Sequence, residues 1–319
     1  MSDTSSIDTD DDSYLSESEL KSLNVQVDPA AIYIEECRGK KCLPISCVVS
    51  DIIERQWLDI NNRGLKDNDA YCIQKIIDIA DEIKGINVAG NYICTNGIHS
   101  LLKSLEIHKI VHLNISNTGF VIDQGDEDEN DKQDQGEEDD NDKKDQGEED
   151  NNNQKKEKEK IITKEILISI MKMPALIDLD ISHNYIGDEG MAVFHMDDWR
   201  NDIYKINLCD VGFTSKSAKF AALLVNEHPL QEYNISWNCL DTKAVHEFFE
   251  TLKSIKRSQE EMQLLNISNV NATDANANDF NEFFHNKKFP NVSKNYNYIP
   301  FIYNQLIKKY RADILLHFV

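Results

Sequence analysis

Residues Leu176 to Phe194 read LIDLDISHNYIGDEGMAVF, and looser copies of this stretch recur along the chain about every 27 residues. Repeats of this period are typical of solenoids, in which each unit buries its apolar face only against its neighbours. The sequence therefore predicts a stack of units with a long exposed surface. Aligned on their apolar centres, the copies share an apolar second position at Leu58, Ile86, Leu113, Leu179, Ile206, Tyr233 and Leu265.

The copies keep their register across one long interruption. Successive second positions are 28, 27, 66, 27, 27 and 32 residues apart. The interval of 66 equals one period plus about 39 residues, which is the length of the acidic segment at 122–160. We therefore interpret 122–160 as an insertion within one repeat.

Within a copy, the apolar pattern changes from strand to helix. Alternation along a strand predicts that Leu179 and Ile181 face inward, while Asp178 and Asp180 face outward. Apolar residues then return at helical spacing, as they do within 245–252. The predicted fold class is α/β, with a parallel sheet lined on one side by helices.

The motif LxxLxLxxNxL in residues 176–186 resembles the leucine-rich repeat of the ribonuclease-inhibitor type. The resemblance covers about residues 56–285. It implies a horseshoe-shaped solenoid, with the parallel sheet on the concave face and the helices on the convex face. The family's buried asparagine is matched at Asn91, Asn184 and Asn238. Because four copies replace it, we expect an incomplete ladder of asparagine hydrogen bonds; the replacements are Arg63, Thr118, Val211 and Val270.

Charge divides the chain unevenly. Of the formal net charge of −23, residues 1–28 carry −7 and residues 123–160 carry −11. Both segments lack apolar periodicity, so they cannot offset the entropy of ordering and are predicted to be disordered. The predicted organisation is a disordered acidic N-terminus at 1–30, a helical cap at 31–55, about seven repeats at 56–285 interrupted by 122–160, and a C-terminal cap at 286–319.

The predicted cap contains YIEECRGKKCLPISCVVSDI, starting at Tyr33. This segment resembles the lead-in of certain leucine-rich repeat proteins of motile cilia and sperm flagella, including a dynein regulatory complex subunit. The resemblance implies a cytoskeletal scaffold and a ciliary or flagellar location.

Chemistry-bearing motifs are missing from the sequence. It contains no nucleotide-binding, metalloprotease or nucleophile-elbow pattern. We therefore expect no enzyme, no cofactor, no metal and no small-molecule ligand, and no nucleic-acid partner. No signal peptide and no apolar run of about 18 residues is found, so a cytoplasmic location without membrane contact is expected. The seven cysteines are predicted to be buried or half-buried in a reducing compartment.

The candidate binding surface is the concave face. Its central row consists of the outward residue of each strand, and this residue is always Asn or Asp: Asp59, Asn87, Asn114, Asp180, Asn207, Asn234 and Asn266. Asn and Asp are also common here in the family, so the row has a structural interpretation too. Trp57 and Trp237 are the candidate anchors, because Trp is enriched at binding hot spots. Either Trp could instead belong to the core.

Three functional hypotheses follow. The first is a non-enzymatic scaffold that binds a protein partner on the concave face. The second is a GTPase-activating protein, because one such family shares this repeat type and carries an acidic segment. The third is an acidic chaperone of basic proteins, which a steep salt dependence tied to residues 123–157 would indicate.

Overall fold

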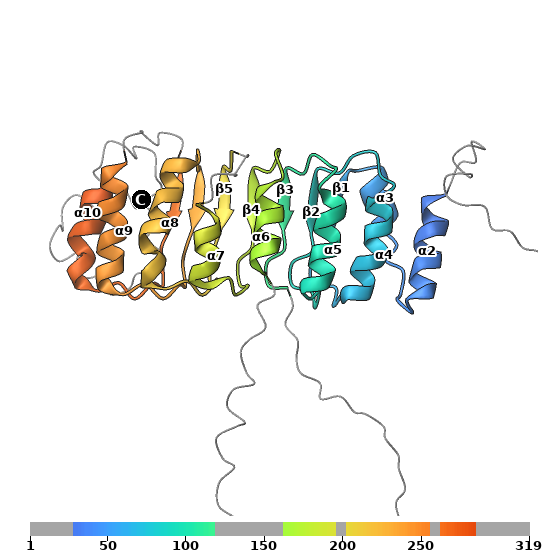
Figure 1. The fold of residues 1–319 in the computed structure, drawn as a ribbon, viewed down its shortest axis with the longest axis horizontal. Coiled ribbons are helices and arrows are strands. Elements are labelled where there is room, and N and C mark those ends of the chain that lie inside the picture. Colours follow the sequence, from blue (N-terminus) through green and yellow to red (C-terminus); the bar gives the residue numbers. More distant parts are fainter. Residues whose placement is uncertain (1–27, 119–161, 196–201, 256–261, 285–319) are drawn as a thin grey trace, which may run out of the picture.

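The computed structural model describes residues 28–118, 162–195, 202–255 and 262–284. The predicted disorder of the acidic insertion lies outside these residues, as do residues 1–27 of the predicted disordered N-terminus and the predicted C-terminal cap at 286–319. Pro29 and Ala30, which the prediction included in that N-terminus, instead begin a helix. The described residues form repeated strand–helix units that stand side by side along one axis (Figure 1).

The strands are short, and all of them run parallel. They form one seven-stranded sheet in which the spatial order follows the chain order. The α/β class with a parallel sheet is thereby confirmed, and the arrangement is compatible with a solenoid. The strands are β1 (Trp57–Asp59), β2 (Gly85–Asn87), β3 (His112–Asn114), β4 (Asp178–Asp180), β5 (Lys205–Asn207), β6 (Glu232–Asn234) and β7 (Leu264–Asn266).

Most of the helices connect successive strands, and these lie together on one side of the sheet (Figure 1). Short 3-10 turns, η1 (Ser215–Ser217) and η2 (Asp274–Asn276), precede two of them. The helices are α2 (Pro29–Gly39), α3 (Val48–Ile53), α4 (Asp67–Ile77), α5 (Thr95–Leu105), α6 (Lys164–Met171), α7 (Gly187–Val193), α8 (Ala218–Glu227), α9 (Thr242–Ser254) and α10 (Ala277–Phe284). None of the described helices has the length and apolar character that crossing a bilayer requires.

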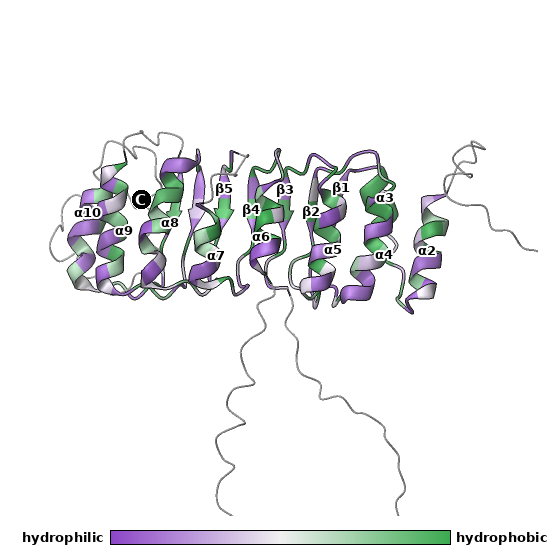
Figure 2. Ribbon diagram, in the orientation of Figure 1, coloured by the Kyte–Doolittle hydropathy of each residue, from purple (hydrophilic) through white to green (hydrophobic). Residues whose placement is uncertain are grey.

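The core lies between the sheet and the helices. The middle residue of each strand from β1 to β6 is buried, while the residues on either side of it point away from the core, as predicted for Leu179 and its neighbours. Each helix carries a hydrophobic stripe and a hydrophilic one (Figure 2). The alternation of the strand and the periodicity of the helix therefore meet in one apolar layer.

The sheet is continuous where the sequence has its longest interval. β3 pairs directly with β4, with Leu113 opposite Leu179, although the two residues are a long way apart in the chain. The pairing continues beyond the strands, because Ile115 N donates to the Asp180 carbonyl oxygen at 3.0 Å. The register predicted from the spacing of the copies is therefore the register of the sheet.

Buried asparagines join the turns that follow the strands. Each one forms hydrogen bonds with its own turn and with the turn of the preceding copy. At the centre of the stack, Asn184 Nδ2 donates to the carbonyl oxygens of Ile115 and Ile181, at 2.8 and 3.1 Å. Its Oδ1 accepts from Thr118 N at 3.0 Å. Thr118 occupies the asparagine position of the preceding copy, so one side chain satisfies two turns.

The same arrangement occurs on both sides of this pair. Asn91 accepts from Arg63 N, and Asn238 accepts from Val211 N. In each case the residue that replaces asparagine in one copy is bonded by the asparagine of the next copy. The predicted incomplete ladder is therefore present, with one asparagine for every two of the first six turns.

Helices α2 and α3 cover the beginning of the stack. Cys37 of α2 and Cys72 of α4 are both in the shared core. Burial raises the pKa of both thiols, so they stay protonated at neutral pH and act as apolar packing groups. The expectation that all seven cysteines are buried or half-buried is wrong for Cys239, which is exposed. It lies between buried Asn238 and buried Leu240, so its own side chain points outward.

Asp188 links two neighbouring units through its carboxylate. Its Oδ1 accepts from Thr214 N at 2.9 Å and from Ser217 Oγ at 2.6 Å, and its Oδ2 accepts from Thr214 Oγ1 at 2.7 Å. Burial acts to raise the pKa of this carboxyl, but the hydrogen bonds outweigh burial and lower the pKa below its ordinary value. The ionised form is therefore the one that stabilises the fold.

We expect Asp188→Asn to reduce the free energy of unfolding at neutral pH by about 1–2 kcal/mol, since the charge-assisted bonds are lost. A carboxyl whose pKa is lower in the folded state than in the unfolded state contributes its full stabilisation above the unfolded-state pKa of about 4. That stabilisation is lost as the pH falls through the folded-state pKa. The variant should therefore lose less stability than the parent on acidification below about pH 4. Thermal melts across this range check the expectation, with the exposed Asp81→Asn as control. Parallel curves for the parent and Asp188→Asn would contradict it.

Candidate protein-binding surface

The face of the sheet opposite the helices, called here the open face, carries the first and third residues of every strand. Pairing from β1 to β7 aligns the third residues in one row. This row contains seven of the nine predicted site residues: Asp59, Asn87, Asn114, Asp180, Asn207, Asn234 and Asn266. Asp59 is exposed, and the other six are half-buried.

A local hydrogen bond explains why this row is always Asn or Asp. In every copy Oδ1 accepts from the backbone N–H two residues further on, as Asn234 does from Ser236 N at 3.1 Å. This is the turn that Asn and Asp side chains form with their own backbone. The row therefore has a structural role in ending each strand, and at Asp180 and Asn207 the second side-chain atom is also bonded within the row.

The first positions of the strands are chemically diverse, and their charges interact across the sheet. His112 Nδ1 is 3.1 Å from Asp178 Oδ2, and Lys205 Nζ is 2.5 Å from Glu232 Oε1. The hydrogen bond that Lys205 donates to the Glu232 carboxylate raises the pKa of Lys205, which stays fully protonated. The charged strand residues on the open face are Asp59, Asp178, Asp180 and Glu232 against Lys205, so this surface is acidic.

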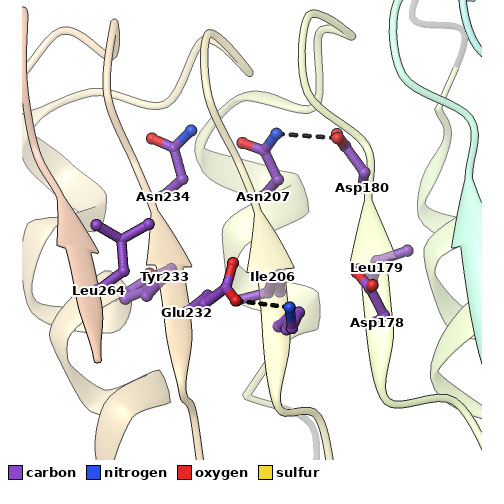
Figure 3. Close-up of a pocket in the computed structure, with 10 residues that line it drawn as sticks. Asp178, Leu179, Asp180, Ile206, Asn207, Glu232, Tyr233, Asn234 and Leu264 are labelled. Carbon is purple, nitrogen blue, oxygen red and sulfur yellow. Dashed lines mark hydrogen bonds and ion pairs between the residues drawn. The ribbon is translucent and has the colours of Figure 1, made fainter. Parts of the chain in front are cut away.

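A groove of about 270 Å³ lies on the open face across β4, β5 and β6, and it ends at Leu264 of β7 (Figure 3). Asn207 and Asp180 line one side of the groove, where Asn207 Nδ2 donates to Asp180 Oδ2 at 2.9 Å. The Lys205–Glu232 pair forms the other side. Charged and amide side chains line the groove together with apolar ones, and the half-buried Leu264 forms its apolar end.

Trp57, the first predicted anchor, lies on the open face with 38% of its surface exposed. Its ring covers Gly85 of the next strand, in the space where any larger side chain would stand. It also contacts the His112 ring edge-on, with 5.3 Å between the ring centroids. Trp57 therefore packs along the sheet and is partly available to a partner.

Trp237, the second predicted anchor, is 60% exposed and has a left-handed backbone with φ of +61°. The turn requires this conformation in every copy, because the corresponding residues all have positive φ. They are Asn62, Gly90, Asn117, His183, Asp210 and Asn269. Gly, Asn and Asp tolerate this region, whereas a bulky side chain in it costs about 1–2 kcal/mol. A bond from Trp237 N to Ser268 O, at 3.0 Å, holds the strained turn in place.

Trp237 is thus unfavourable for stability because its bulky side chain strains the backbone, and its largely exposed ring gains little from burial in return. Strained residues cluster at functional sites, where binding compensates for their cost. Sequence comparison between the copies contained this signal, because Trp occupies a column of small or polar residues. Asp210 occupies the same turn position in the preceding copy, and its Oδ2 is 3.3 Å from His183 Nδ1. Asp210 was not among the predicted site residues.

No protein-family model matches the chain, and the search of curated proteins also gives no match.

Proposed function

We propose that this chain is a leucine-rich repeat protein of the ribonuclease-inhibitor type and serves as a non-enzymatic scaffold. The parallel sheet in chain order, the helices on one side of it and the paired turn asparagines all support this proposal. The open face would then be the concave side of the horseshoe, and it would bind a protein partner. Solenoids commonly use such extended surfaces for binding.

Trp237 is the observation that carries the proposed binding role. A tryptophan that costs stability and stands in solvent fits a partner that buries it, and buried Trp residues dominate many interfaces. The acidic groove beside β4–β6 favours a partner with a basic surface, because charge complementarity guides association. The proposed partner is therefore a protein with an apolar pocket next to Lys or Arg residues.

Trp237→Asn separates the binding role from a packing role, because the two predict opposite effects on stability. Asn accepts the left-handed backbone, so we expect the free energy of unfolding to rise by about 1 kcal/mol and the melting temperature by about 2–4 °C. Partner affinity should fall about 30-fold or more, the effect of a hot-spot residue worth about 2 kcal/mol. A melting temperature that falls together with binding would identify Trp237 as a packing residue instead.

The binding arm uses affinity purification from the cells that express the chain, followed by titration of the recovered protein. The full chain, Trp237→Asn and the control Phe220→Gln are compared at two salt concentrations. Phe220 is also exposed but lies on α8, on the helical side. The scaffold proposal requires a partner that binds the full chain and the control and is lost with Trp237→Asn. Cytoskeletal partners would favour the ciliary resemblance.

Two other results would replace this proposal. Recovery of a small GTPase whose hydrolysis rate increases on addition of the chain would indicate a GTPase-activating protein. Recovery of basic proteins that are released by salt, and that no longer bind after deletion of residues 123–157, would indicate an acidic chaperone. In both cases the effect of Trp237→Asn shows whether the open face takes part.

A further inference from the structure

A group of metal-ligating side chains lies on the helical side, far along the stack from the first units. His246 and Glu250 are one turn apart on α9, and Asp279 is in the first turn of α10. His246 Nδ1 is 2.8 Å from Asp279 Oδ1. One ligand atom from each of the three residues lies within 4.8 Å of the other two.

Asp279 is held in place by groups behind it. Its side chain is only 9% exposed, and its Oδ2 accepts from Asn276 Nδ2 at 3.1 Å. Asn276 is itself buried and also donates to the Thr242 carbonyl oxygen at 2.9 Å. A carboxylate oriented by a second layer of hydrogen bonds is a recurrent feature of metal ligands.

The three side chains supply two carboxylates and one imidazole. A buried carboxylate normally has a compensating charge nearby, because removing an ion from water is costly. Here the buried Asp279 faces a second carboxylate, Glu250, and an imidazole that is positive only when protonated. The nearest lysine on α9, Lys253, bonds Glu250 Oε1 at 2.7 Å and also pairs with Glu282. If Glu250 turned toward a cation, Lys253 would keep Glu282 as its partner.

We propose that His246, Glu250 and Asp279 form a Zn²⁺ site that joins α9 to α10. One imidazole nitrogen and two carboxylate oxygens are ligands that zinc accepts, and water would fill the fourth tetrahedral position. The imidazole favours zinc over the oxygen-seeking Mg²⁺ and Ca²⁺. Bound zinc balances the two carboxylates and links the last two described units of the stack. This inference does not depend on the proposed partner binding.

The sequence shows only part of this site. His246 and Glu250 are four residues apart in one predicted helix, but Asp279 is 33 residues away from His246. Only the stacking of one unit on the next brings them together. The expectation of no metal was drawn from motifs within single segments, which do not report on pairs of helices from different units.

Isothermal titration of the full chain with Zn²⁺, after removal of metal by a chelator, tests the proposal. We expect one site in the low-micromolar range or tighter, and a melting temperature that rises with the Zn²⁺ concentration. His246→Gln should weaken this site on the order of tenfold or more. Since the His246 side chain is 57% exposed, this variant should still fold. Mg²⁺ at the same concentration should not compete.

Matched controls distinguish the proposed site from other ligands in the chain. Glu250→Gln should weaken binding, whereas Glu247→Gln, an exposed acid on the same helix, should not. His195→Gln removes another histidine paired with a carboxylate and should also leave the titration unchanged. Titrations of the parent and His246→Gln that coincide would overturn the proposal, and so would the absence of micromolar binding by the parent.

Discussion

Asn184→Ala is expected to lower the free energy of unfolding by about 3 kcal/mol. The substitution removes one side chain but leaves several buried groups without partners, because Asn184 bonds two carbonyl oxygens, the Thr118 amide and the Thr118 hydroxyl. Each buried polar group that loses its partner costs about 1–3 kcal/mol. Local rearrangement and water entry recover part of this cost.

Thermal or urea unfolding measures the effect, and Asn226→Ala is the matched control. Asn226 is an exposed residue of α8, so its replacement should change stability by no more than about 0.5 kcal/mol. Asn184→Asp is a sharper variant, since it keeps the acceptor but loses both donors. Equal stability of Asn184→Ala and the control would show that the two central turns do not depend on their shared asparagine.

Phe249→Ala is expected to cost about 4 kcal/mol. Phe249 is almost fully buried and contacts three other aromatic rings. Its ring centroid is 5.5 Å from that of Phe248, 4.9 Å from Phe280 and 5.4 Å from Phe283. Removing a buried phenylalanine side chain costs about 3–5 kcal/mol, because apolar contacts are lost and a cavity remains.

This loss should be concentrated near α10, because stability in a stack of units is a sum of each unit and its contacts with its neighbours. Hydrogen exchange is therefore the most informative measurement. Amides of α9 and α10 should lose protection first, while those of α4 and α5 keep theirs. Phe220→Ala, which truncates a partly exposed ring, is the control. Uniform loss of protection along the whole stack would mean that the units unfold together.

The strand register could be predicted from the sequence because each copy is a local pattern. The apolar second position of each copy marks the middle of one strand. Pairing these positions in chain order places Leu113 opposite Leu179. The buried asparagines were also visible as a column in the aligned copies. Such features depend on residues within one unit, so a periodic sequence is sufficient to place them.

The remaining features depend on contacts between units or on local geometry. The role of the Asn and Asp row became clear only from the bond to the amide two residues on. The position of Trp57 over Gly85 requires the neighbouring strand, and the group around Asp279 requires the neighbouring helix. The exposure of Cys239 follows from the direction of one side chain in a turn. None of these is encoded by the spacing of apolar residues.

The bond between Asn184 and Thr118 also bears on how long the interval between them can be. It joins residues that are 66 positions apart, directly beside a continuous sheet. The entropy of closing such an interval grows only with the logarithm of its length, so doubling it costs about 0.6 kcal/mol. Between these two residues the chain carries three copies of an eleven-residue DQG sequence. Adding or removing one such copy would therefore change this entropic cost by only about 0.1 kcal/mol.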